Sequence, residues 1–100
     1  MMVEEKLFNS IKGIVDLNTD PPIACAWVDK IHNHGGKDKR LLLISDSSAY
    51  FFSKSPFSKN LSISRHFYWF NLTDIKYINV TNFHMFFKTG DMNVQHKDAK

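Results

Sequence analysis

The sequence predicts a mainly β domain: a seven-stranded antiparallel barrel or sandwich preceded by one short helix. One of three observations predicts the strands, and the other two limit the kind of domain that they form. Seven short apolar runs follow residue 22, and turn-forming residues separate them at regular spacing. A chain of 100 residues can bury enough surface for a single core. Its one cysteine, Cys25, excludes an internal disulfide and a cysteine-based zinc site.

Residues 1–22 form the first predicted unit, an amphipathic helix followed by a stop at Asp20-Pro21-Pro22. Over residues 3–15 the apolar side chains recur at helical spacing, and these are Leu7, Phe8, Ile11, Ile14 and Val15. Burying them contributes roughly 1.5–3 kcal/mol each, which outweighs the cost of about 1 kcal/mol for Gly13. We therefore expect this helix to pack against the rest of the chain.

Residues 23–100 form the predicted β domain, which begins where the apolar period changes to two. In the first strand, Ile23, Cys25 and Trp27 would share one face. Residues 37–52 predict a β-hairpin, because four aliphatic residues and three aromatic residues flank a small polar turn. Further strands are expected at 61–70, 75–80, 83–88 and 92–96, with a polar loop at 53–60 and a tight turn at 89–91.

Two stretches resemble a known superfold: RLLLISDSSAYFF (Arg40–Phe52) and FNLTDIKYINV (Phe70–Val80). They are similar to pleckstrin-homology (PH)-like domains, above all those of the CARMIL group of leucine-rich-repeat actin-capping regulators and of the myosin-I tail. The resemblance implies a cytoplasmic, peripheral-membrane adaptor within a larger actin-associated protein. The helix that closes such domains after the last strand is absent from these residues, so we expect a fragment of a longer protein.

Basic loop residues form the candidate lipid site. Lys30, Lys37, Lys39 and Arg40 bracket the first loop of the β domain, and their spacing resembles the phosphoinositide signature of PH domains, with Lys39 in place of an arginine. Because side chains alternate along a strand, Lys37 and Lys39 are expected to point the same way and Arg40 the opposite way. In a meander the first and third turns lie at the same end of the sheet. The third loop would then add Lys54, Lys59 and the aromatic side chain of Phe57 as a membrane contact.

The charge balance permits an anionic phospholipid surface as a partner, a phosphoinositide included. The formal net charge is +3. Five or six basic residues, less Asp29 and Asp38, would give about 4 kcal/mol, which is a millimolar-class attraction. Stable recruitment would therefore need a second domain, dimerisation or a headgroup pocket. The alternatives are that these lysines are merely solvated, or that the chain is a protein-interaction or dimerisation module without lipid binding.

Other functional classes have little support in the sequence. It contains no nucleophile elbow, phosphate-binding glycine loop or obvious carboxylate pair, so we expect a non-enzymatic domain without a cofactor. His32 and His34 lack a third metal ligand and are expected to belong to a flexible loop, where their protonation would add to the basic charge. The aromatic run at 66–70 alternates between the two strand faces, which argues against a nucleic-acid platform.

Overall fold

The computed structural model describes residues 9–55, 57, 60–79 and 81–96. Its strands are β1 (Pro22–Ile31), β2 (Lys37–Ser45), β3 (Ser48–Lys54), β4 (Leu61–Tyr68), β5 (Leu72–Asn79), β6 (Asn82–Phe87) and β7 (Gly90–Gln95). A 3-10 turn, η1 (Trp69–Asn71), links β4 to β5. All paired strands are antiparallel, so the predicted mainly β fold with seven antiparallel strands is confirmed.

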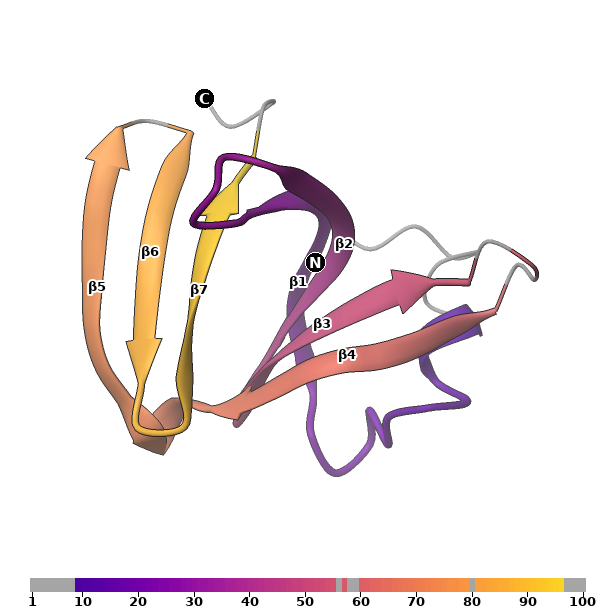
Figure 1. The fold of residues 1–100 in the computed structure, drawn as a ribbon. Coiled ribbons are helices and arrows are strands. Elements are labelled where there is room, and N and C mark those ends of the chain that lie inside the picture. The colour runs from indigo at the N-terminus through magenta and orange to yellow at the C-terminus, as the bar shows by residue number, and fades with distance from the viewer. Residues whose placement is uncertain (1–8, 56, 58–59, 80, 97–100) are drawn as a thin grey trace.

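The seven strands belong to one bent sheet that does not close. Their order is β4-β3-β2-β1-β7-β6-β5, which makes β4 and β5 the two edges. Strands β1–β4 form one meander and β5–β7 a second. The two meanders are joined where Asp29 and Lys30 of β1 oppose Gln95 and Val94 of β7. Figure 1 shows β5–β7 on one side of the bend and β3 and β4 on the other. Of the two predicted forms, the sheet adopts the open, sandwich-like one.

The inner face of the bend holds the first hydrophobic core. Both halves of the sheet contribute to it, and its buried residues are Val28, Leu42, Ala49, Phe51, Phe67, Met85, Phe87, Met92 and Val94. The rings of Phe67 and Phe87 stack with centroids 4.4 Å apart, which joins β4 to β6 across this core. Full burial of such a side chain contributes about 1.5–3 kcal/mol, so the inner core holds the two halves of the sheet together.

The outer face of β1–β3 holds a second core, which the N-terminal segment covers. Its buried residues are Ile11, Val15, Cys25, Leu41, Leu43, Tyr50 and Phe52. Strands β2 and β3 are thus buried on both faces, which explains why they read as continuous apolar runs. The predicted alternation along β1 holds from Cys25 onward, because Cys25 and Trp27 pack in the outer core and Val28 in the inner one. Ile23, which was expected to share the face of Cys25, is 57% exposed and lies at a register shift.

The N-terminal helix ends earlier than predicted. Within the described residues only 9–11 are helical, and turns follow at 12–14. The backbone N–H groups of Ile14 and Val15 both donate to the carbonyl of Ile11, which ends the helix there. Gly13, the weakest helix former of the stripe, lies in this turn. Ile11 and Val15 are buried as expected, whereas Ile14 is 39% exposed. Leu7 and Phe8 lie outside the described residues.

Candidate anion-binding site

The β1–β2 hairpin places the predicted basic residues on two opposite faces. Lys30 opposes Asp38, Ile31 opposes Lys37, Asp29 opposes Lys39, and Val28 opposes Arg40. Because side chains alternate along a strand, Lys37 and Lys39 share the outer face and Arg40 lies on the inner one, as the sequence predicted. The tip closes through Gly35, whose φ of +91° favours glycine and whose N–H donates to the His32 carbonyl.

On the outer face, Lys37 and Lys39 each contact a neutral group. The Lys37 ammonium donates to Oε1 of Gln95 at 2.7 Å, which ties the hairpin to the end of β7. The Lys39 ammonium lies 5.3 Å from the ring centroid of Trp27. Neither contact neutralises the lysine, and both side chains are exposed, with that of Lys39 beside the indole ring of Trp27.

On the inner face, the Asp38 carboxylate contacts two basic side chains. Nε2 of His32 lies 2.6 Å from Oδ2 of Asp38, and the Arg40 guanidinium lies 3.6 Å from the same oxygen. The hydrogen bond to His32 lowers the pKa of the Asp38 carboxyl, and the charges of Arg40 and Lys30 lower it further. Asp38 thus engages the basic groups that a bound anion would contact, and it reduces the net charge of the loop.

A polar pocket opens beside this loop. It has a volume of about 190 Å³ and is lined by Lys30, Ile31, His32, Asn33, Arg65, Asp91 and Asn93. Within the described part of the chain, neither Lys30 nor Arg65 forms an ion pair with a carboxylate, whereas Asp91 is paired with His84. The pocket therefore brings two cations from different strands together, although the Asp38 carboxylate interacts electrostatically with Lys30 and the Asp91 carboxylate lines the same pocket.

Sequence reasoning missed Arg65. It lies on β4 opposite Phe51, on the strand face that also carries the buried Phe67. A charged residue at a position where the period-two pattern expects an apolar one is the signal that would have found it. Its proximity to Lys30 follows from the bend of the sheet and has no counterpart in the sequence.

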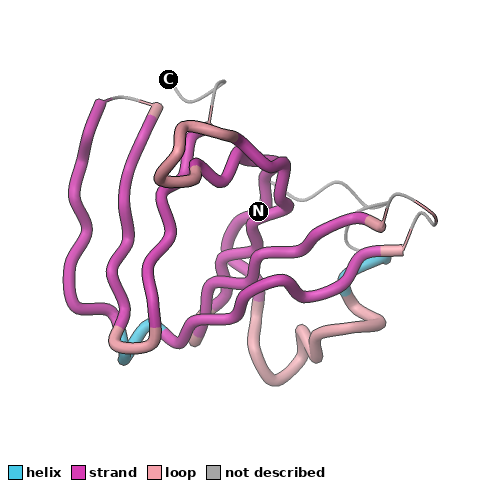
Figure 2. Tube along the Cα trace, viewed as in Figure 1, coloured by secondary structure: helices cyan, strands magenta, loops and turns pink. Residues whose placement is uncertain are grey.

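The third loop does not join the first loop. Lys54 ends β3, and Phe57 is 96% exposed, while Lys59 lies outside the described residues. In Figure 1 the β3–β4 tip projects away from the β1–β2 tip, and Figure 2 shows the same separation of the two strand ends. The expectation that both loops lie at one end of the sheet is therefore wrong. Residues 41–44 of β2 pair with β3, while residues 37–40 continue along β1 toward β7.

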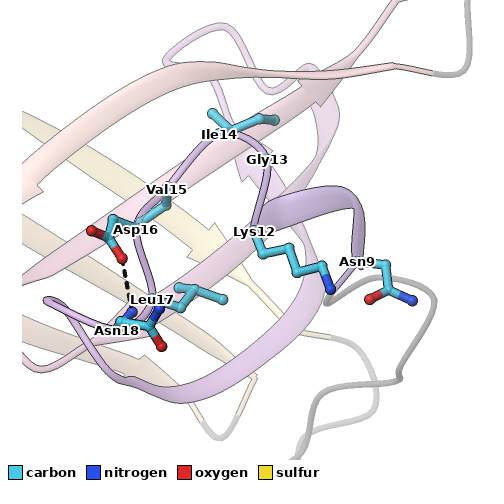
Figure 3. Close-up of a pocket in the computed structure, with 8 residues that line it drawn as sticks. All are labelled: Asn9, Lys12, Gly13, Ile14, Val15, Asp16, Leu17 and Asn18. Atoms are coloured by element: carbon cyan, nitrogen blue, oxygen red, sulfur yellow. Dashed lines mark hydrogen bonds between the residues drawn. The ribbon is translucent and has the colours of Figure 1, made fainter.

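A larger pocket, of about 800 Å³, lies within the N-terminal segment. Figure 3 shows its described lining residues, which belong to one stretch of chain: Asn9, Lys12, Gly13, Ile14, Val15, Asp16, Leu17 and Asn18. The Asp16 carboxylate accepts a hydrogen bond from the N–H of Asn18 at 3.0 Å, which stabilises the local turn. With one lysine and one engaged carboxylate, this pocket offers no group of residues for recognition or chemistry.

A polar cluster under the β2–β3 turn contains a serine–histidine pair that the sequence did not suggest. Nε2 of His66 lies 2.8 Å from Oγ of Ser48. Such a pair can act as nucleophile and base only where a substrate reaches the hydroxyl. Ser48 is fully buried, and Tyr50 stacks on the His66 ring at 4.2 Å. We therefore assign this pair a structural role.

Asp20 connects this cluster to the N-terminal segment. Its carboxylate accepts hydrogen bonds from the Ser45 hydroxyl at 2.8 Å, the Tyr50 hydroxyl at 2.8 Å and the Ser47 N–H at 3.0 Å. Burial acts to raise the Asp20 pKa, but these hydrogen bonds outweigh it and lower the pKa. Burial and the Asp20 bond raise the Tyr50 pKa in turn. The cluster fastens residues 9–21 to the sheet.

The described residues contain neither a cluster of possible metal ligands nor a helix that could span a membrane. No three His, Cys, Asp or Glu side chains there are close enough to hold a metal ion. His32 and His34 stack on one another at 5.1 Å, and His32 is engaged by Asp38. No helix in the described ranges is both long and apolar enough to cross a membrane.

Comparison with known proteins adds no family assignment. Neither a protein-family model nor a curated protein sequence matches this chain. The function of the chain must therefore be inferred from the geometry described above.

Proposed function

We propose that this chain is a non-catalytic PH-like adaptor domain that holds a larger protein at an anionic membrane surface. The pocket lined by Lys30 and Arg65 carries this proposal, because it brings together two cations from separate strands, neither of which forms a salt bridge among the described residues. A phosphate-bearing lipid headgroup is the ligand class that suits such a pocket. The seven-stranded antiparallel sheet is compatible with the PH-like folds of the CARMIL group and the myosin-I tail that the sequence resembles.

The charge of the loop sets the strength of the contact. The β1–β2 hairpin has four basic residues and two aspartates, Asp29 and Asp38, so its net charge is two positive charges. The opposite charges of Arg65 and Asp91 in the pocket cancel, so the net charge stays the same when they are included. At about 1 kcal/mol per charge this gives about 2 kcal/mol, a dissociation constant of roughly 30 mM. General attraction is thus weaker than the sequence suggested. A specific headgroup contact in the pocket, or a second copy of the domain, must supply the rest.

The β3–β4 tip supplies a second contact point in this proposal. Phe57 projects into solvent, and Lys54 lies at the end of the preceding strand. An exposed aromatic ring beside a cation suits insertion at a membrane interface. Because this tip lies apart from the pocket, we expect the two contacts to contribute independently.

The test is sedimentation with vesicles of phosphatidylcholine alone, with phosphatidylserine added, and with a phosphoinositide added. The Lys30→Ala/Arg65→Ala chain should lose binding, while Lys12→Ala/Lys88→Ala, which removes the same charge elsewhere, should retain it. Binding should weaken as salt rises. A soluble inositol phosphate that competes would identify the headgroup as the ligand. Equal losses in both double variants would refute the pocket as the site.

A second candidate function has a specific observation in its favour. Strand β5 is an edge of the sheet, and seven of its eight residues are exposed. An exposed edge strand can accept an extended segment of another chain through main-chain hydrogen bonds. If the wild-type chain binds none of the vesicles, a protein-interaction module becomes the better assignment.

A further inference from the structure

Strand β5 carries apolar side chains that the fold does not bury. Ile75 is 47% exposed, Tyr77 81% and Ile78 54%. Ile75 and Tyr77 lie opposite Met85 and Phe83 of β6, so they extend the apolar inner face of the sheet to its edge. Edge strands are usually protected by proline, bulges or several charges, and in β5 register shifts occur only near its two ends, which leaves residues 74–77 regular. The sequence LTDIKYIN contains no proline and only two charged residues, Asp74 and Lys76.

We propose that β5 pairs with β5 of a second copy of this chain, antiparallel about a two-fold axis at Ile75. This inference goes beyond the proposed membrane contact and does not depend on it. When the two-fold axis passes through one residue, the residue before it in one copy lies opposite the residue after it in the other copy. Asp74 of one copy then opposes Lys76 of the other, and the same pair forms again on the far side of the axis.

The charges of β5 favour the axis at Ile75 over axes at the adjacent residues. An axis at Lys76 would place two lysines directly opposite each other, and an axis at Asp74 would do the same with two aspartates. Like charges directly opposite across a strand pair are destabilising, whereas opposite charges are stabilising. Only the axis at Ile75 converts both charged residues of the strand into attractive pairs. The second copy is therefore the partner whose charge pattern β5 complements.

The faces of the strand agree with this arrangement. Asp74 and Lys76 oppose Phe86 and His84 of β6, so both lie on the outer face, and the Lys76 ammonium is 5.6 Å from the Phe86 ring centroid. On the inner face, Ile75 would meet its own copy and Tyr77 would meet Thr73. The pairing thus buries apolar side chains on one face and joins charges on the other.

In the single chain, one backbone N–H group of the β5 edge is satisfied by a side chain of the same strand. The N–H of Ile75 donates to Oδ1 of Asp74 at 2.8 Å within the same strand. Pairing would exchange this local bond for contacts between copies, in which Asp74 engages Lys76 of the other copy. Register shifts at Leu72/Asp74 and Tyr77/Asn79 limit the regular stretch to residues 74–77. An interface of this length is smaller than the standard size of about 1,600 Å², so we expect a weak dimer.

The test is sedimentation equilibrium from low micromolar to several hundred micromolar protein. The wild type should show a monomer–dimer equilibrium. Asp74→Lys alone or Lys76→Asp alone would create two like-charge pairs and should weaken the dimer about tenfold or more. Mixing the two single variants should restore a dimer, because each then meets the opposite charges. The double exchange Asp74→Lys/Lys76→Asp should restore it as well.

Controls make each outcome decisive. Lys12→Asp and Asp46→Lys change charge by the same amounts away from β5 and should leave the equilibrium unchanged. Circular dichroism checks that every variant is folded. A wild type that stays monomeric throughout would overturn the inference, as would a dimer that ignores the charge exchanges. Vesicle binding by the monomeric variants reports on the proposed membrane function separately.

Discussion

Replacement of Asp20 tests the polar cluster that fastens the N-terminal segment to the sheet. Asp20→Ala removes the acceptor of three hydrogen bonds, two from side chains and one from the Ser47 N–H. Hydrogen bonds to a charged group contribute about 1.5–3 kcal/mol each when buried. Because Asp20 is only partly buried, we take about 1 kcal/mol for each bond, or about 3 kcal/mol in total. The Tyr50 hydroxyl also loses its acceptor.

Urea unfolding followed by circular dichroism measures this loss. For a chain of this size, 3 kcal/mol corresponds to a fall in melting temperature of roughly 12–24 °C. Asp20→Asn keeps the shape and one acceptor oxygen, so it should lose less. Asp46→Ala is the matched control, since Asp46 lies in the adjacent turn and is exposed. Equal losses for Asp20→Ala and Asp46→Ala would refute the reasoning.

Acid should weaken the effect of the Asp20 substitution. The folded pKa of Asp20 lies below the ordinary value of 3.8, so its stabilisation is complete above that value. It is lost as the pH falls through the folded pKa, where the folded carboxylate takes up its proton. The difference in unfolding free energy between wild type and Asp20→Asn should therefore shrink in strong acid. A constant difference would contradict the assigned hydrogen bonds.

Two further predictions concern buried titratable groups. Burial lowers the His66 pKa below 6.5, despite an opposing effect of Asp20. The unfolded chain therefore takes up a proton at a higher pH than the folded chain, so stability should fall as the pH drops through 6.5, with a smaller fall in His66→Phe. Burial raises the Cys25 pKa to about 11. A thiol reagent should therefore label Cys25 only at the rate of unfolding, and rapid labelling of the folded chain would contradict its burial.

The two proposals reinforce each other if both hold. One copy offers about two net positive charges at the β1–β2 hairpin, which is too few for stable recruitment by general attraction. Two linked copies would engage a membrane through an intramolecular second step, which raises the apparent affinity without any new contact. Monomeric β5 variants should then bind vesicles more weakly than the wild type at concentrations where the wild type is a dimer.

The sequence was sufficient to predict the elements of this fold. Period-two patterns and turn residues are local signals, and they located all seven strands and the β2–β3 turn. The same alternation correctly assigned Lys37 and Lys39 to one face and Arg40 to the other. It also predicted that the aromatic residues at 66–70 alternate between two faces, and in β4 Phe67 is buried while Tyr68 is exposed. Each of these results depends only on neighbouring residues along one strand.

The tertiary structure decided everything that depends on how the strands meet. The bend between the two halves of β2 separated the first and third loops, so Lys54 and Phe57 lie apart from Lys30. The same bend brought Arg65 to the pocket, although 35 positions separate it from Lys30 in the chain. Asp38 could not be recognised as the centre of the loop charges until the register was known. Such contacts come from the packing of two cores, which no local pattern records.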